Sequence, residues 1–163
     1  MSGSKKSFVA RYGGIYERSP WVAAEAAEIA GDIDDADRLA QVMAECVDNA
    51  PYEKRLELIR AHPDLAGRAQ VAGELTTDST TEQASAGLDH CSAAEYERFQ
   101  VLNRAYREKF GFPFVMAVRD SDRRRILDAF ESRLENDVDT EFETALAEIH
   151  EIARLRLEAL DSG

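Results

Sequence analysis

A capped run of large apolar residues between Ser92 and Gly111 constrains the fold more than any other part of the sequence. Its opening tetrapeptide, Ser92-Ala-Ala-Glu95, has the form of a capping box, and glycine is a common residue just past the end of a helix. The apolar side chains between these signals recur every three or four positions, the spacing of one helix face. They are Tyr96, Phe99, Leu102, Tyr106 and Phe110. The sequence therefore predicts a long amphipathic helix here.

Two further helices are predicted before residue 50. Residues 35–48 carry apolar side chains at helical spacing, and Asp34 or Asp35 can cap the first turn. An earlier helix should start at Ser19 and Pro20, because a capping hydroxyl followed by proline is a helix-start signal. We expect it to run to about residue 30, with Gly31 ending it.

Three more helices are predicted in the rest of the chain. Residues 51–62 form a short one that Pro63 should stop, which leaves His62 at a helix end. Another follows Asp122, and Thr140-x-x-Glu143 opens the last one as a second capping box.

Two segments lack a helical pattern. Residues 112–118 are apolar and strand-like, but a single strand that contains proline cannot make a sheet, so we expect a buried connecting segment. Residues 68–81 are expected to form a polar loop. With 163 residues the chain fits one domain, 1–163. The predicted fold is all-α: a single-domain compact helical bundle of about seven to nine helices, with no sheet.

The charge balance argues against some classes of protein. The chain has 32 Asp and Glu against 20 Lys and Arg, a net charge of -12, which opposes binding to the phosphates of nucleic acid. It has no stretch of about 18 uncharged apolar residues, and its start lacks the apolar run of a secretory signal. We therefore expect no membrane association and a cytoplasmic location. Cys46 and Cys91, which have no zinc-site spacing, are expected to be reduced and buried.

The basic residues are sixteen Arg and four Lys. Arginine in place of lysine, together with abundant carboxylates, is typical of an acidic proteome adapted to high salt. Salt there reduces the distance over which the carboxylates repel one another. A GC-rich genome also favours Arg over Lys, so both explanations stay open.

Four sequence motifs together resemble one known family. They are Tyr12-Gly-Gly-Ile-Tyr16 ahead of Ser19-Pro-Trp21, then Ala61-His-Pro-Asp-Leu-Ala-Gly67, then Ser79-x-x-Glu-Gln83 with Ala86-Gly-Leu88, and Phe110-Gly-Phe-Pro-Phe-Val-Met-Ala-Val-Arg119. Their order and spacing resemble those of the 2-oxo-4-hydroxy-4-carboxy-5-ureidoimidazoline (OHCU) decarboxylases over nearly the whole chain. Any one motif alone would be weak.

His62 is the leading candidate for catalysis. Imidazole titrates near neutral pH and is well suited to move a proton. An exposed histidine favoured by the dipole at a helix end is the structural alternative. The resemblance matches His62 to the catalytic histidine of the family, with Pro63 beside it at the pocket wall.

Ser79, Glu82 and Gln83 match residues that line the active site in the family. The resemblance implies that Glu82 hydrogen-bonds the substrate, that Gln83 positions it and that Ser79 lies in the pocket wall. From the sequence alone, Ser79-x-x-Glu82 can equally be a capping box, in which the glutamate bends back to its own helix.

Arg119 ends an apolar run, where an unpaired buried charge would be costly. It either pairs with a carboxylate or binds an anion. The resemblance implies the second, a substrate-binding arginine whose planar fork suits a carboxylate.

The resemblance also implies an activity. It is the cofactor-free decarboxylation of a small ureidoimidazoline to (S)-allantoin and carbon dioxide in urate (purine) degradation, by a homodimer. Two alternatives remain open. One is a metal-dependent hydrolase that uses His62, Asp64 and Glu82 as ligands, with His90 as an optional fourth. The other is a non-enzymatic helical binding module.

Overall fold

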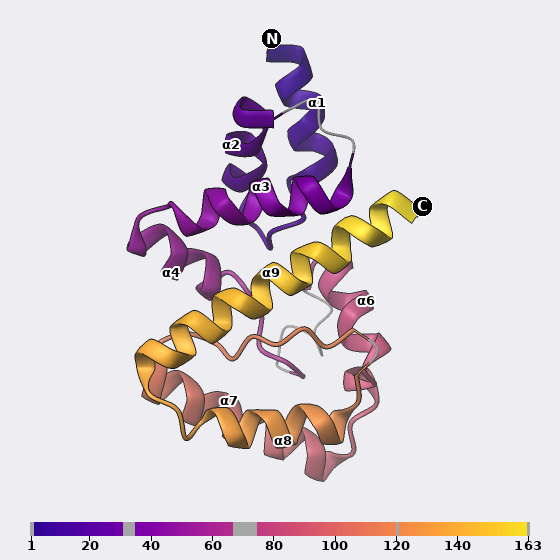
Figure 1. Ribbon diagram of the computed structural model, residues 1–163. Helices are drawn as coiled ribbons and strands as arrows, with labels where there is room; N and C mark the ends of the chain where they lie inside the picture. Colours follow the sequence, from indigo (N-terminus) through magenta and orange to yellow (C-terminus); the bar gives the residue numbers. More distant parts are fainter. Residues whose placement is uncertain (1, 31–34, 67–74, 120, 163) are drawn as a thin grey trace. The chain divides into compact units, whose positions relative to one another are not determined.

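The computed structural model describes residues 2–30, 35–66, 75–119 and 121–162, and these described parts are helical with no strand (Figure 1). They contain eight α-helices and one 3-10 helix, η1 (Leu88–His90). The all-α prediction is therefore confirmed. The contacts divide the chain into two units, one of residues 1–61 with 149–163 and one of residues 62–148. The expectation of a single domain stays a prediction.

The first unit contains four helices and the last part of a fifth. The four are α1 (Ser2–Tyr12), α2 (Trp21–Ala30), α3 (Ala36–Asp48) and α4 (Tyr52–Arg60), and the fifth is α9 (Val138–Ser162). Of the two predicted caps for α3, Asp35 is the one used, since its side chain accepts from the backbone N–H of Asp37. The Ser19 hydroxyl donates to the carbonyl of Glu17, and α2 starts at Trp21, one residue after the predicted Pro20. The predicted helix end at Gly31 lies outside the described residues.

The motif at residues 12–16 packs inside the first unit. A Cβ on Gly13 would lie 2.5 Å from the carbonyl oxygen of Val9, so only glycine fits this turn after α1. Tyr16 is buried, and its hydroxyl lies 2.7 Å from Nδ1 of His150, whose Nε2 is 3.1 Å from the Asp48 carboxylate. Burial is the main cause that raises the pKa of Tyr16, so this phenol stays protonated.

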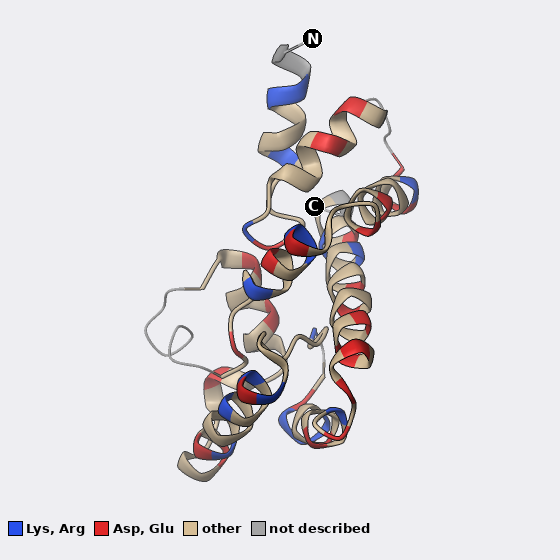
Figure 2. Ribbon diagram, turned by 90° about the vertical axis from the view of Figure 1, so that its left-hand side faces the viewer, with Lys and Arg blue, Asp and Glu red and all other residues tan. Residues whose placement is uncertain are grey.

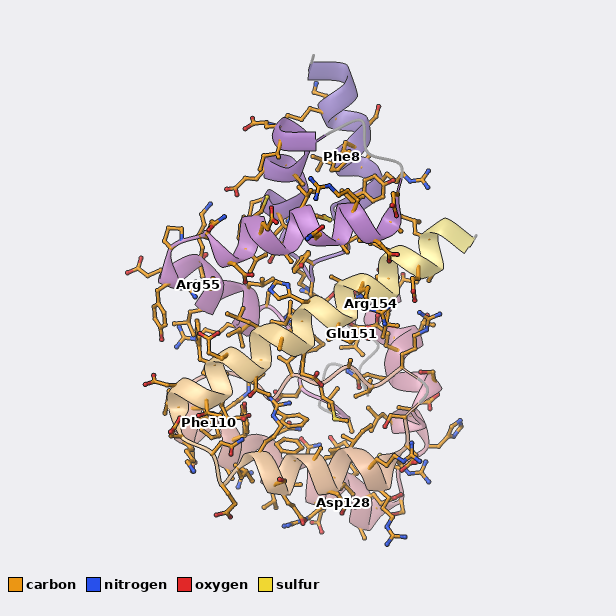
Figure 3. The ribbon with its side chains drawn as sticks, in the orientation of Figure 1. Phe8, Arg55, Phe110, Asp128, Glu151 and Arg154 are labelled. Carbon is orange, nitrogen blue, oxygen red and sulfur yellow. The ribbon has the colours of Figure 1, made fainter. Side chains whose placement is uncertain are left out.

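A buried ion pair also holds the first unit together. Arg156 lies 3.3 Å from the carboxylate of Glu17 and also donates to the carbonyl of Gly14. Glu151 and Arg154 form a second pair on the solvent side of α9 (Figure 3). The exposed pair carries little stability, because water and salt screen it.

The second unit is built on the aromatic helix predicted from the sequence. This helix, α7 (Ala93–Phe110), has the predicted capping box between Ser92 and Glu95 and ends at Gly111 with φ 80°. It contacts α8 (Arg123–Arg133), as Figure 1 shows. The unit also holds α6 (Thr77–Ser85), η1 and the start of α9. The aromatic stripe predicted on α7 is largely buried, with Phe99, Tyr106 and Phe110 in the core.

Some sequence predictions of local structure were wrong. Residues 77–81 belong to α6 instead of a loop, while residues 68–74 lie outside the described part. The last helix starts at Val138 and not near Thr140. The Asp137 carboxylate accepts a hydrogen bond from the backbone N–H of Thr140 and so caps the helix at an earlier residue. Cys46 is buried as expected, but Cys91 is only half-buried.

Acidic and basic residues are spread along the helices of both units (Figure 2). No helix in the described residues is long and apolar enough to cross a membrane.

Candidate active site

His62 lies two residues beyond the end of α4, in a loop whose described residues are 62–66. The helix-end position was predicted, but the alternative of an exposed histidine is wrong, since only 6% of His62 is accessible. Pro63, which follows it, is half-buried. His62, the histidine of this motif, is therefore held inside the protein. A proton-transfer group that must be sheltered from bulk water needs such a position.

Three candidate residues share one face of α6. The N-cap of this helix is Thr76, whose hydroxyl oxygen accepts from the backbone N–H of Ser79 at 3.2 Å. Ser79, Glu82 and Gln83 thus lie inside the helix at spacings of three and four, which place them on one side. Ser79 and Gln83 are buried, and Glu82 is half-buried. The capping-box alternative for Ser79 and Glu82 is wrong, because Thr76 occupies the cap.

The side chain of Gln83 connects α6 to the loop of His62. Its Oε1 accepts from the backbone N–H of Ala66 at 3.1 Å, and its Nε2 donates to the carbonyl of Asp64 at 3.3 Å. The structure thus joins two of the four motifs through a buried carboxamide. Both the oxygen and the nitrogen of this carboxamide bond to the loop. The sequence did not indicate that Gln83 would hold the loop.

The ligands proposed for a metal-dependent hydrolase do not form a cluster. The Asp64 carboxylate is held by Arg107, with Oδ1 2.9 Å from Nη2 and 3.0 Å from Nε. His90 lies in η1 with 80% of its side chain exposed. Among the described residues no group of three or more His, Cys, Asp or Glu side chains could hold a metal ion. The hydrolase alternative is not favoured.

The apolar segment 112–118 is a connecting segment without strand structure, as predicted. Phe112, Phe114, Val115 and Val118 are buried, and Met116 is half-buried. Charged side chains hold its backbone: Nη1 of Arg133 donates to the carbonyl of Val115 at 2.6 Å, and Glu148 accepts the N–H of Ala117 at 3.2 Å. The segment therefore has a fixed conformation without strand pairing.

A buried polar network lies under this segment. Glu141 is fully buried and accepts hydrogen bonds from Tyr106, Arg133 and Asn136 at 2.6, 2.8 and 2.8 Å. Burial is the main cause that raises the pKa of Tyr106, with the hydrogen bond to Glu141 second, so the phenol remains a donor. The guanidinium of Arg133 also lies over the ring of Phe114. This network stabilises the core and the segment together.

Arg119 follows the segment in a turn and is exposed. Its guanidinium therefore does not carry the cost of a buried charge. An exposed arginine remains able to bind an anion that reaches it from solvent.

The sequence did not point to two carboxamides on α7. Nε2 of Gln100 donates to the carbonyl of Ala66 at 2.7 Å, and Nδ2 of Asn103 donates to the carbonyl of Leu65 at 3.0 Å. The position of Asn103 could have indicated its role, because it lies four residues after Phe99 and three before Tyr106, on the apolar face of the helix. A polar amide on a buried stripe needs a hydrogen-bond partner.

The comparisons with known sequences agree on one family. The family model described as OHCU decarboxylase matches residues 2–158. An OHCU decarboxylase of Haloferax volcanii is 51% identical over 151 residues, which are 93% of this chain and 87% of the relative. One from Xenopus laevis is 37% identical over 96% of this chain and 89% of its own.

Solved structures give the same result. A crystal structure of (S)-allantoin synthase aligns with a TM-score of 0.76 at 33% identity and covers 96% of this chain and 50% of its own. An OHCU decarboxylase crystallised in the presence of (S)-allantoin shares the fold, with a TM-score of 0.68 at 24% identity over 85% of this chain and 92% of its own. The chain therefore belongs to the OHCU decarboxylase family.

Proposed function

We propose that this protein decarboxylates 2-oxo-4-hydroxy-4-carboxy-5-ureidoimidazoline and releases (S)-allantoin and carbon dioxide in urate degradation. The observation that carries the proposal is the buried His62, fixed in a loop that Gln83 bonds, in a chain of this family. A sheltered imidazole in a loop bonded to a helix that carries a serine, a carboxylate and a carboxamide suits a small polar substrate.

The chemistry explains why such a small set of residues is sufficient. As the bond to the carboxylate breaks, carbon dioxide leaves and the electron pair passes into the adjacent C=N and carbonyl system of the substrate. A proton must then be delivered to one face of the product. Because the substrate itself accepts the electrons, the protein needs only to orient the substrate and to move protons. His62 is the acid/base group in this proposal.

The other candidates orient the substrate. Glu82, half-buried on α6, accepts hydrogen bonds from the ureido or ring N–H groups. Gln83 contacts the substrate through the N–H donor and the oxygen lone pair that its two loop bonds leave unused, since an amide has two donors and two acceptor lone pairs. Arg119 binds the carboxylate or a ring edge, and Ser79 with Pro63 forms the pocket wall.

The assembly and location of the protein are also proposals. We infer a homodimer from the family resemblance and a cytoplasmic location from the expectations of the sequence. Light scattering on the purified protein tests the first. Two copies per particle support it, and a monomer at micromolar concentration contradicts it.

The deciding experiment generates the unstable substrate from urate with the two upstream enzymes and follows circular dichroism of the allantoin formed. Spontaneous decay gives a racemate, so optical activity reports catalysis. His62→Gln should lose about 10²- to 10⁴-fold in rate, the usual contribution of a general acid or base. His90→Gln is the matched control, because His90 is exposed and outside the motifs.

Two results would overturn the proposal. One is racemic allantoin from the wild-type protein. The other is His62→Gln with more than about a tenth of wild-type activity, far above what loss of a general acid or base allows. Chelator treatment should leave the rate unchanged, and a loss that zinc or manganese restores would return the hydrolase alternative.

A further inference from the structure

The loop of His62 is held by an unusual set of contacts. Three carboxamide side chains bond four of its backbone groups: Gln83 with the carbonyl of residue 64 and the N–H of residue 66, Asn103 with the carbonyl of residue 65, and Gln100 with the carbonyl of residue 66. Two of these side chains belong to α7 and one to α6. None of the three changes its charge with pH.

The backbone of this loop needs such support. Ala66 has φ 51°, a left-handed conformation that is strained for a residue with a Cβ. Strained residues persist only where surrounding contacts fix them. The bonds from Gln83 to the N–H and from Gln100 to the carbonyl of Ala66 supply this fixation, and Asn103 fixes the peptide before it.

Asn103 shows most clearly that these contacts serve more than stability. It is 4% exposed and lies among buried apolar residues of α7. Its Nδ2 bonds the loop, but its Oδ1 is buried and accepts no hydrogen bond from any residue that the structure describes. A buried acceptor without a partner costs roughly 1–3 kcal/mol. An apolar residue here would avoid that cost but would leave the Leu65 carbonyl without its bond from residue 103.

We propose that Asn103 is a positioning residue: its bond to the carbonyl of Leu65 sets the place of the loop and thereby of the His62 ring. The kinetic part of this inference rests on the proposed function of His62, whereas the structural part does not. Asn103 sits on a long helix in the core of its unit, so it gives the loop a rigid reference point.

The effect on rate follows from geometry. Misplacement of a catalytic group by about 1 Å can cost roughly 10²-fold in rate. Asn103→Asp keeps the size but removes the donor and faces the Leu65 carbonyl with a second acceptor. We expect kcat to fall by about 10- to 100-fold with KM changed by less than about threefold, because substrate contacts remain while the proton-transfer group moves.

The experiment measures kcat, KM and the histidine ring signals in NMR spectra of protein labelled with ¹³C-histidine. The chain has three histidines, so His62→Gln identifies the His62 signal. Asn103→Asp should shift or broaden this signal and leave those of His90 and His150 in place. Gln100→Glu removes a donor to the same loop from a half-buried position and should give a smaller change of the same kind, which keeps the test open if Asn103→Asp does not fold.

Ile126→Ala is the control for general destabilisation. Ile126 is fully buried in α8 and makes no hydrogen bond to the loop through its apolar side chain. This variant should lower the melting temperature but leave kcat and all three histidine signals unchanged below melting. The inference is overturned if folded Asn103→Asp keeps the wild-type His62 signal and kcat, or if Ile126→Ala loses kcat equally. Failure of His62 itself would appear separately, as activity retained in His62→Gln.

Discussion

Two irregular segments of the second unit carry motif residues, and they are held by different chemistry. Neutral carboxamides bond the backbone of loop 62–66, and the ion pair between Asp64 of this loop and Arg107 involves a side chain and not the backbone. Charged groups hold segment 112–118, through Arg133 on the carbonyl of Val115 and Glu148 on the N–H of Ala117. The second segment also makes an aromatic contact: the ring of Phe114 stacks on the ring of Phe130, with 3.9 Å between the centroids.

This difference indicates what each segment does. A neutral hydrogen bond contributes about 1 kcal/mol, and its strength does not depend on pH because neither partner titrates. A buried charge costs much more when its partner is lost. The 112–118 segment is therefore part of what holds the unit folded, whereas the contacts of loop 62–66 determine chiefly where one imidazole lies.

The largest effect should come from Arg133→Met. This change removes the partner of a fully buried carboxylate, Glu141, and leaves that charge uncompensated. We expect a loss of about 3–5 kcal/mol in the free energy of unfolding, measured by urea denaturation. The double variant Arg133→Met with Glu141→Leu should recover part of the loss, since it removes the stranded charge. A loss below about 1 kcal/mol in the single variant would show that the network is not part of the core's stability.

An intermediate effect is expected when the neutral loop contact is made titratable with Gln83→Glu. The new carboxyl is buried and can donate to the carbonyl of Asp64 only when protonated, so its pKa in the folded protein should lie above its ordinary value. A raised acid pKa means that the folded state binds the proton more tightly. The variant should therefore lose stability as pH rises above about 4.3, by roughly 1–3 kcal/mol at neutral pH.

Thermal melting of Gln83→Glu and the wild type between pH 4 and pH 8 measures this difference. The two curves should approach each other at the acid end and separate toward neutral pH. Parallel curves would mean that the loop tolerates a charge at this position and that its contacts do not need to be neutral. Asn136→Asp, at the buried network, gives the matched carboxamide-to-carboxylate change beside the other segment.

The smallest effect concerns an exposed charged contact, the capping box of α7. The hydrogen bond from the backbone of Ser92 is the main cause that lowers the pKa of Glu95, and Arg123 adds to it. The stability that this group contributes is present above the ordinary glutamate pKa and is lost as pH falls through the lowered one. Glu95→Gln should thus cost well under 1 kcal/mol at pH 7, because the pair is partly exposed, and less at pH 3. A cost that is equal at both pH values would assign the effect to helix propensity instead.

Much of the helical framework could be predicted from local sequence signals. The cap of α3 at Asp35 and the box at Ser92 are short-range hydrogen bonds, so neighbouring residues determine them. Competition between nearby acceptors explains two errors. Thr76 caps α6 ahead of Ser79, and Asp137 caps α9 ahead of Thr140. The first helix, α1, was not predicted, since it buries little besides Phe8 and shows no apolar face.

The contacts around His62 could not be predicted in the same way. The family motifs identified the candidate residues, but nothing in the local pattern shows that Gln83, Gln100 and Asn103 meet one loop. Residue 103 is separated from residue 65 by 38 positions. Such contacts depend on the tertiary arrangement of α6 and α7, which periodicity does not fix.

The division of the chain into two units has a consequence for the order of folding. The second unit is one continuous stretch, residues 62–148, whereas the first needs residues from both ends, such as Tyr16 and His150, which are 134 positions apart. Closing so long a loop is entropically costly and slows assembly. During synthesis the second unit can therefore fold as soon as its own stretch is complete, whereas contacts such as the one between Tyr16 and His150 form only after α9 has been made. The site motifs of the second unit are then formed before the N-terminal helices acquire their final packing.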